Sequence, residues 1–211
     1  MAKKWFTSDW HLADDRMSLL RRPFKDAKEA RDTLVKNYNE CVSEDDIAYF
    51  IGDIALDEEW LKSVGDLNGH KILIKGNYDQ LDDDIYKKYF NGVGSSVTIW
   101  KAEDPDKKSE EILNLHLVHY PTHAKADFFN LVGHIHGCWK IQKNMLNVSI
   151  DCHNFKPISL EEVYFFYRAI CNFYDQDVWV ANHEANRAYD FRGKAGTYSE
   201  TGEKGSFFSK K

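Results

Sequence analysis

Residues 131–137 of this chain read Leu-Val-Gly-His-Ile-His-Gly and place two histidines two positions apart. In an extended segment, this spacing directs both imidazoles to the same face of the backbone. Two neutral imidazoles at the end of a buried strand can contribute to a metal site. Gly133 and Gly137 flank the pair and allow the backbone to approach a bound group closely. An isolated pair of this kind is more often a hairpin with two surface histidines, so the other ligand-type residues decide between the two interpretations.

Other carboxylate, amide and imidazole side chains stand just past apolar, strand-like runs elsewhere in the chain. Each of them taken alone has a structural explanation, such as a turn aspartate or a core histidine with a satisfied ring nitrogen. In open α/β sheets, however, ligand sites gather at the carboxyl ends of the strands. The residues with this placement are Asp9, His11, Asp53, Asn77, His119, His134 and His136. Their number and order favour one shared site over seven unrelated positions.

The elements that must position these residues follow from the apolar pattern. Helices are predicted to begin near Asp26 and Asp57 and at the acidic run 82–84, where a helix start explains the charges without a ligand role. Ser159 and Glu162 form a capping box that opens a further helix. The stretch before Asp26 is expected to be a loop. Strands are predicted at residues 4–8, 47–51, 71–75, 96–100, 112–118, 129–132 and 144–150.

The composition sets limits on the class of protein. With 211 residues, 43% of them hydrophobic, the chain can bury one good core, and we expect one domain over residues 1–192 with a polar tail at 193–211. The net charge of −6 argues against a protein that grips a nucleic acid backbone. We expect no membrane span, because no apolar run approaches about 20 residues. The four cysteines form no C-x-x-C pair, and with no signal peptide at the N-terminus this predicts reduced thiols in a cytoplasmic protein.

The order of the ligand-type residues resembles the metallophosphoesterase (calcineurin-like phosphoesterase) superfamily, whose pattern is D-x-H, G-D, G-N-H-D/E, a lone H and G-H-x-H. The resemblance covers about the first two-thirds of the chain, and segments 7–8, 119–121 and 156–162 look like the small single-domain bacterial and phage members. It implies an α/β fold of two facing mixed β-sheets flanked by helices, with a dinuclear metal site at the carboxyl ends of the strands. The matching blocks are Asp9-Trp10-His11, Gly52-Asp53, Gly76-Asn77-Tyr78-Asp79, His119 and Gly133-His134-Ile135-His136.

The resemblance also implies a role for each ligand residue. Asp53 would bridge two metal ions held about 3.5–4 Å apart, which lower the pKa of a water and clamp phosphoryl oxygens. The implied activity is hydrolysis of a phosphate ester by attack of metal-bound hydroxide. Imidazole, carboxylate and amide ligands together suit Mn, Fe or Zn, with Mn favoured, better than Ca or Mg. The first ion would be held by Asp9, His11, Asp53 and His136, and the second by Asp53, Asn77, His119 and His134.

One position departs from the superfamily pattern. Tyr78 stands where the superfamily usually has the catalytic histidine next to the metal-ligand Asn77. A tyrosine has a pKa near 10, so Tyr78 would be a poor proton donor at neutral pH but can donate a hydrogen bond. Asp79 then has no imidazole to orient. His123, four residues after His119, is the alternative source of an imidazole, although the favoured interpretation is a surface histidine. With Asn77 and Tyr78 at the catalytic position, the departure favours phosphodiesters, and a phosphomonoesterase of the same fold remains the alternative.

The expected partner is a phosphorylated small molecule or a nucleotide as substrate, with no stable nucleic acid complex, no membrane and an open oligomeric state. Two other classes of function stay open beside the enzyme. One is a non-catalytic metal-binding interaction domain that kept the fold, and the other is a regulatory module that binds phosphate or a nucleotide. Metal content and hydrolysis of an aryl phosphodiester distinguish these three hypotheses.

Overall fold

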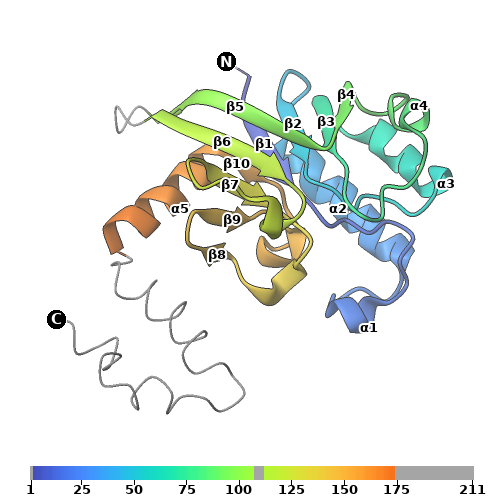
Figure 1. Ribbon diagram of the computed structural model, residues 1–211. Helices are drawn as coiled ribbons and strands as arrows, with labels where there is room; N and C mark the ends of the chain where they lie inside the picture. The colour runs from blue at the N-terminus through green and yellow to red at the C-terminus, as the bar shows by residue number, and fades with distance from the viewer. Residues whose placement is uncertain (1, 107–111, 174–211) are drawn as a thin grey trace, which may run out of the picture. The chain divides into compact units, whose positions relative to one another are not determined.

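A computed structural model describes residues 2–106 and 112–173 of the chain (Figure 1). Met1–Phe165 forms one compact unit, which holds both β-sheets and the candidate site. A second unit is assigned to Phe166–Lys211, and within it the structure describes only the end of helix α5 (Leu160–Phe173). The domain boundary expected at residue 192 and the polar tail at 193–211 lie outside the described residues and stay predictions.

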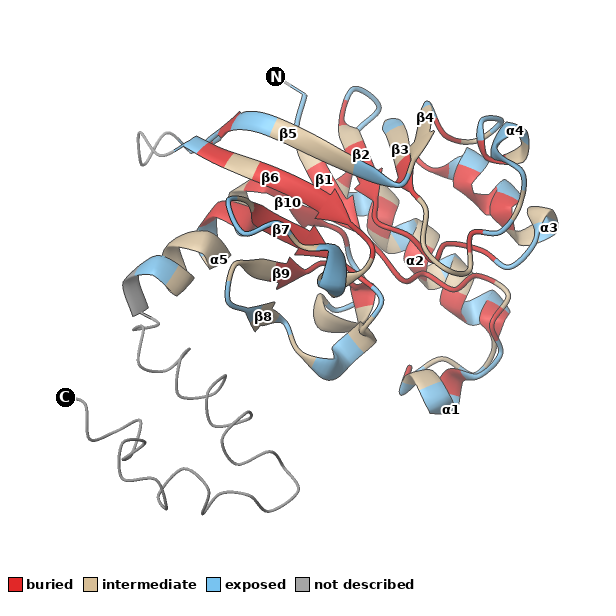
Figure 2. Ribbon diagram, viewed as in Figure 1, coloured by how far each residue is buried: buried red, intermediate tan, exposed pale blue. Residues whose placement is uncertain are grey.

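The first sheet contains the strands that the sequence predicts at residues 4–8, 47–51 and 71–75. Its order is β10-β1-β2-β3-β4, with β10 antiparallel to β1 and the other neighbours parallel. The central strands are largely buried (Figure 2), as expected for a sheet covered on both faces. The strands are β1 (Lys4–Thr7), β2 (Ile47–Phe50), β3 (His70–Ile74), β4 (Gly92–Gly94) and β10 (Ile158–Ser159).

The second sheet has the order β5-β6-β7-β9-β8 and is also mixed. β6, β7 and β9 run parallel, while β5 and β8 are antiparallel edge strands. The strand expected over 144–150 ends early, because the chain turns at Ser149 into the 3-10 helix η4 (Ile150–Cys152). The strands are β5 (Ser96–Glu103), β6 (Ile112–Val118), β7 (Phe129–Val132), β8 (Ile141–Gln142) and β9 (Met145–Asn147).

The helix starts predicted near Asp26, Asp57 and Ser159 are confirmed by their caps. The Asp26 carboxylate accepts the Glu29 backbone N–H at 2.8 Å at the start of α2 (Ala27–Cys41), and Asp57 caps α3 (Glu58–Leu61) in the same way. The capping box at Ser159 makes both of its hydrogen bonds, at 2.8 and 3.2 Å. The short helix α1 (Met17–Leu20) interrupts the expected loop, and α4 (Asp83–Tyr86) begins in the acidic run 82–84, as predicted, without a side-chain cap. The remaining 3-10 helices are η1 (Lys62–Asp66), η2 (Pro121–His123) and η3 (His136–Cys138).

Trp10 anchors the loop that follows β1 in the hydrophobic core. Its side chain is 1% exposed, and its ring lies 5.8 Å from that of Tyr38 on α2 and 5.4 Å from that of Phe50 on β2. Its indole N–H donates to the Thr7 hydroxyl at 2.7 Å. Burying a tryptophan side chain contributes roughly 4 kcal/mol. Because Trp10 separates Asp9 from His11 in the sequence, this packing also fixes where those two side chains emerge.

The carboxyl ends of the two sheets meet through the segments that follow β1 and β9. Ser8 and Ser149 form a parallel bridge, and the Ile150 backbone N–H donates to the Ser8 carbonyl at 3.2 Å. The Asp9 backbone N–H donates to the Gly52 carbonyl at 3.0 Å, which also joins the loops after β1 and β2. The fold therefore gathers strand-end residues from both sheets in one region (Figure 1).

Two expectations that concern the whole chain can be compared with the structure. All four cysteines are free thiols, as predicted, and Cys138 and Cys171 are exposed. Within residues 2–106 and 112–173, no helix has both the length and the apolar composition needed to span a bilayer.

Candidate metal centre

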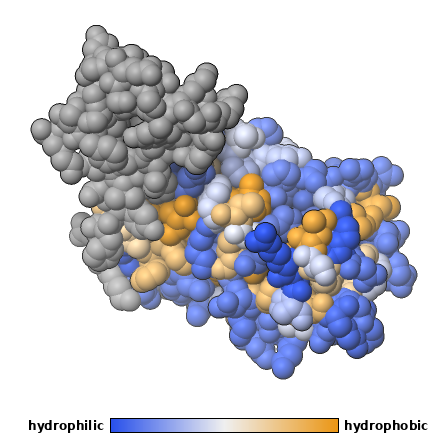
Figure 3. Space-filling model, turned by 90° about the horizontal axis from the view of Figure 1, so that it is seen from below, coloured by the Kyte–Doolittle hydropathy of each residue, from blue (hydrophilic) through white to orange (hydrophobic). Residues whose placement is uncertain are grey.

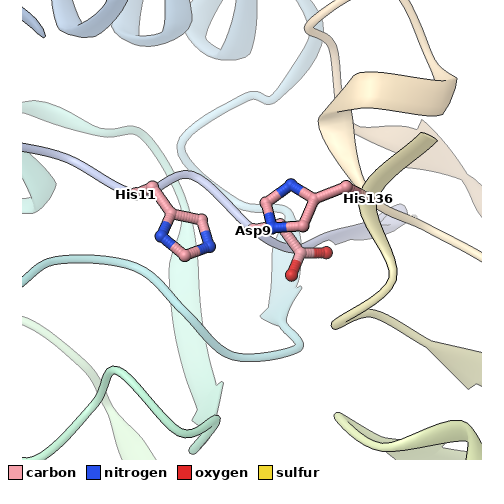
Figure 4. A group of neighbouring side chains, drawn as sticks. All are labelled: Asp9, His11 and His136. Carbon is pink, nitrogen blue, oxygen red and sulfur yellow. The ribbon is translucent and has the colours of Figure 1, made fainter. Parts of the chain in front are cut away.

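The structure brings all seven predicted ligand residues together at the carboxyl ends of β1, β2, β3, β6 and β7. Two groups of side chains within this region could each hold a metal ion, because their ligand atoms all lie within 4.8 Å of one another. Asn77 joins the second group, since its side-chain oxygen lies 3.2 Å from His119 Nε2 and 2.9 Å from His134 Nδ1. The groups are Asp9, His11 and His136 (Figure 4), and Asp53, His119 and His134.

His11 is the clearest sign that the first group has space for a cation. The residue is 4% exposed, yet neither ring nitrogen has a hydrogen-bond partner among the described residues. Burying unpaired polar atoms costs free energy, so such atoms require an explanation. Burial lowers the pKa of His11 to about 4, and the ring is therefore neutral near pH 7. A neutral imidazole has a lone pair on one ring nitrogen and is therefore a metal ligand in the correct protonation state.

Asp9 completes the first group as a fully buried carboxylate. It accepts hydrogen bonds from the Ser8 hydroxyl at 2.7 Å and from the His134 backbone N–H at 2.9 Å. Burial raises its pKa, although the neighbouring His119 and His136 act in the opposite direction. A cation beside Asp9 would favour the ionised form and offset this cost.

In the second group, a backbone hydrogen bond determines which nitrogen of His119 faces the site. His119 Nδ1 donates to the Ile51 carbonyl at 2.8 Å, which leaves Nε2 directed at the Asp53 carboxylate, 3.3 Å away. Burial lowers the pKa of His119, but the hydrogen bond to Asp53 and the charges of Asp9 and Asp53 outweigh it, so the pKa is raised. A cation bound between this nitrogen and the carboxylate would replace the proton.

Asp53 lies between the two groups. Its Oδ2 atom is 3.5 Å from His11 Nε2 of the first group and 3.3 Å from His119 Nε2 of the second. Its Oδ1 atom accepts the Tyr78 backbone N–H at 2.8 Å, which fixes the orientation of the carboxylate. Burial raises the pKa of Asp53, but hydrogen bonds from His119 and Tyr78 outweigh it and hold the pKa below its ordinary value. This is the arrangement that a bridging carboxylate requires.

The segment that carries His134 and His136 is not extended, so the prediction that both imidazoles share one face of a strand is wrong. The two residues have φ angles of 74° and 49°, in the left-handed region. The chain turns directly after β7, where the Ile135 N–H donates to the Gly133 carbonyl at 2.9 Å, and η3 then begins. The turn sends the two rings to different groups instead of to one face.

The glycines next to the ligands differ in their importance. A Cβ atom on Gly133 would lie 2.7 Å from the Ser8 hydroxyl, and one on Gly76 would collide with the Asp53 carboxylate. Both positions therefore exclude a side chain. A Cβ on Gly137 would meet no protein atom within 4 Å, so the fold itself does not require a glycine there, and a close approach to a bound group stays a prediction.

Asp79 has a structural role that the sequence interpretation did not give it. Its buried carboxylate accepts three backbone N–H groups, from Asp53 at 2.7 Å, Ile54 at 3.0 Å and Gly76 at 2.8 Å. Burial raises its pKa in spite of these hydrogen bonds. Asp79 thus joins the loops after β2 and β3 directly and needs no imidazole partner at position 78.

Arg22 and Asp151 are further site residues that the sequence interpretation missed. The Asp151 carboxylate accepts His136 Nδ1 at 2.7 Å and a paired contact from the fully buried Arg22 side chain. Burial raises the pKa of Asp151, but these two partners outweigh it and the pKa is lowered. The only sequence signal was the position of Asp151 after an expected strand, because Arg22 lies in a stretch interpreted as loop.

Tyr78 stands at the wall of the site, with its ring edge-on to His11 at 4.5 Å between centroids. Its hydroxyl accepts a hydrogen bond from Arg16 Nη2 at 2.8 Å, and Asp14 holds the same guanidinium at 2.8 and 2.6 Å. The phenolic proton is therefore free to be donated elsewhere. His123 is exposed on η2, as predicted.

A cavity of about 630 Å³ opens over the two groups. This is in the range of small-molecule sites. Its lining includes polar residues, among them Asp53, Asn77 and Tyr78, and apolar residues, among them Leu20 and Phe155. On the face drawn in Figure 3, apolar patches are likewise separated by hydrophilic residues.

Comparisons with known proteins give fold similarity without an established function. No family model matches the chain. The chain is 28% identical over 167 residues to an uncharacterized protein, MJ1445, of Methanocaldococcus jannaschii, a match that covers 76% of this chain and 89% of that protein. It is 34% identical over 84 residues to the gene 66 protein of Mycobacterium phage L5, which covers 37% of this chain and 41% of that protein.

Among solved structures, the protein of unknown function AQ665 from Aquifex aeolicus is similar with a TM-score of 0.62 and 21% identity, over 79% of this chain and 100% of that one. A structure described as a novel archaeal phosphodiesterase gives a TM-score of 0.43 and 14% identity, over 75% of this chain and 98% of that one. The similarity to AQ665 supports a mixed α/β fold with two mixed sheets.

Proposed function

We propose that this chain is a dinuclear metal-dependent phosphoesterase of the metallophosphoesterase type, acting preferentially on phosphodiesters. The observation that carries the proposal is the position of Asp53. One oxygen of its carboxylate lies within 3.5 Å of ring nitrogens from both candidate metal groups. A carboxylate shared in this way offsets the repulsion between two cations.

The donor set fits two divalent transition metals. The four histidines, two aspartates and one asparagine supply nitrogen and oxygen ligands, which suit Mn, Fe or Zn. The two unpaired nitrogens of His11 and the buried carboxylate of Asp9 are groups whose burial a cation would stabilise. We propose Mn as the favoured metal.

Two bound cations would supply a low-pKa water as nucleophile and would bind the phosphoryl oxygens. The remaining steps depend on the chain's own residues. Asn77 Oδ1 lies 3.2 Å from His119 Nε2 and 2.9 Å from His134 Nδ1, so these three atoms would hold one cation together. The hydroxyl of Tyr78 accepts from Arg16, so its own proton can be donated to a phosphoryl oxygen at the mouth of the site.

The weak acidity of a phenol determines the substrate preference in this proposal. At neutral pH a tyrosine stays protonated and transfers its proton poorly, so it cannot efficiently assist a basic leaving group. Among esters of the same phosphate, we therefore expect those with an aryl leaving group to be hydrolysed faster than those with an alkyl one. We propose a phosphorylated small molecule or a nucleotide as the substrate, with the apolar lining residues Leu20 and Phe155 accepting its organic part.

The experiment uses the full-length chain loaded with Mn²⁺. We expect elemental analysis to find two metals per chain, and bis(p-nitrophenyl) phosphate to be hydrolysed faster than p-nitrophenyl phosphate. A chelator should abolish both activities. No more than one metal would contradict the dinuclear site, two metals without turnover would indicate the non-catalytic domain, and a faster monoester would indicate the phosphomonoesterase.

A further inference from the structure

We propose that Arg22 and Asp151 are positioning residues that make the first group, Asp9, His11 and His136, the tighter of the two metal sites. The inference rests on the proposed dinuclear function and adds that the two sites differ in metal affinity. It follows from the hydrogen-bond partner of the ring nitrogen that points away from the metal position in each histidine.

Behind His136 stands a carboxylate. His136 Nδ1 donates to Asp151 Oδ2 at 2.7 Å, so Nε2 is the nitrogen left for a cation. A carboxylate that accepts the second N–H of a histidine fixes the ring and increases the basicity of the ligating nitrogen. The Asp151 side chain is 8% exposed, which shields this hydrogen bond from solvent.

Arg22 connects that carboxylate to the backbone of Asp9. Its Nε and Nη2 atoms donate to the two oxygens of Asp151 at 2.8 and 3.1 Å. Its Nη1 atom donates to the Trp10 carbonyl at 2.7 Å, and Nη2 also donates to the Asp9 carbonyl. The planar guanidinium forms these bonds in a fixed geometry that a lysine cannot reproduce. One buried side chain therefore fixes two ligands of the first group, although they are far apart in the sequence.

The second group has weaker support. His119 Nδ1 donates to a neutral backbone carbonyl, that of Ile51, at 2.8 Å. His134 Nδ1 contacts the amide oxygen of Asn77 at 2.9 Å, and Asn77 is itself a proposed ligand. Among the hydrogen bonds of the described residues, no carboxylate accepts the second ring N–H of His119 or His134 as Asp151 accepts that of His136. The charge and rigidity behind the first group predict that it keeps its metal at lower free-metal concentrations.

The test is calorimetric titration of the chelator-treated full-length chain with Mn²⁺. We expect the wild type to bind two ions with different affinities. Asp151→Asn keeps the size of the side chain but removes its charge, and it should weaken the tighter step by about 10–100-fold. The weaker step should change by less than about 3-fold. His134→Gln should weaken the other step instead, which assigns each step to its group.

Asp46→Asn is the matched control. Asp46 is 6% exposed and accepts hydrogen bonds from the Trp5 indole, the Lys3 N–H and the Ser43 N–H, away from the candidate site. Like Asp151→Asn, this change removes a buried, hydrogen-bonded carboxylate. We expect it to lower the melting temperature without changing either metal affinity. If Asp46→Asn lost metal affinity as Asp151→Asn does, the loss would be a general effect of destabilisation, and it would contradict the positioning role of Asp151.

The outcomes separate the two proposals. A wild type that binds no metal would contradict the proposed function and this inference together. A wild type that binds two ions, with both affinities unchanged in Asp151→Asn, would leave the function intact and show that Arg22 and Asp151 are only structural. Equal weakening of both steps would contradict the assignment to the first group. If Asp151→Asn does not fold, Arg22→Lys supplies the same measurement, with weakening of the tighter step expected.

Discussion

Replacing Asp53 by asparagine removes a negative charge from between the two candidate metal groups and nearly preserves the side-chain shape. The amide oxygen of Asn would take over the hydrogen bond from the Tyr78 N–H, which Asp53 Oδ1 accepts at 2.8 Å. The amide nitrogen would then stand where Oδ2 is, facing the ring nitrogens of His11 and His119 at 3.5 and 3.3 Å. A hydrogen-bond donor would thus occupy the position where a shared cation needs a lone pair.

The size of the effect follows from the burial and the distances. The Asp53 side chain is only 2% exposed, so water screens its charge weakly. A carboxylate and a cation about 4 Å apart interact by roughly 4 kcal/mol with an effective dielectric constant of about 20. A 100-fold loss of turnover corresponds to about 2.7 kcal/mol. The interaction energy lost with the Asp53 charge is larger than about 2.7 kcal/mol. We therefore expect turnover of an aryl phosphodiester to fall by at least about 100-fold.

The assay compares turnover, metal content and melting temperature of Asp53→Asn with those of Asp46→Asn, a buried carboxylate outside the site. Without metal, Asp53→Asn should remain folded. The substitution removes a minor repulsion with Asp9, but it also removes the attraction to His119 that, against the effect of burial, holds the pKa of Asp53 low, so we expect a lower melting temperature than that of the wild type. We expect Asp46→Asn to lose stability and keep its turnover. Near-normal turnover of Asp53→Asn with two metals retained would refute the bridging role.

Three further outcomes are expected. Tyr78→His should accelerate the hydrolysis of alkyl phosphodiesters more than that of aryl ones. The gain should be smaller than the roughly 10²–10⁴-fold that an optimised general acid contributes. Equal acceleration of an alkyl and an aryl ester of the same phosphate would exclude a role of residue 78 in protonating the leaving group. Gly76→Ala should lower both metal content and melting temperature, because its Cβ would collide with the Asp53 carboxylate. Burial lowers the pKa of His153 to about 4, so its contribution to stability is present above pH 6.5 and is lost as the pH falls from 6.5 towards 4. In His153→Gln, the amide can still donate a hydrogen bond to the Asn147 carbonyl. The free energy of unfolding, measured between pH 6.5 and 4, should therefore fall by up to about 3 kcal/mol less in this variant than in the wild type.

The ligand residues could be predicted from the sequence because each follows an apolar strand. The runs before Asp53 and Asn77 are buried parallel strands, and parallel strands end at the same edge of a sheet. The glycines at positions 76 and 133 mark close approaches that the structure contains. Hydrophobic patterning and turn residues were sufficient for this part of the fold, because both are local properties of the chain.

The supporting network could not be predicted in the same way. Arg22 meets Asp151 across 129 positions, and no local pattern specifies that pair. The strands β4 and β10 have three and two residues and are too short to show a period. Helix α1 spans only four residues and has no side-chain cap, so its sequence carries no start signal. These features depend on tertiary contacts.

Backbone conformation provides an independent argument that the region is functional. Five of the candidate ligands have φ angles in the left-handed region, which only a few per cent of non-glycine residues adopt. Each such residue costs on the order of 1–3 kcal/mol and persists only where its surroundings enforce it. The enforcing contacts are present: the Asp9 N–H is bound by the Gly52 carbonyl and the His11 N–H by the Asp53 carbonyl, both at 3.0 Å. A chain that needed these loops only as connections would have no reason to maintain such strain at carboxylates and imidazoles, whereas a site that must direct several ligands at a common point requires it. The residues are Asp9, His11, Asp53, His134 and His136.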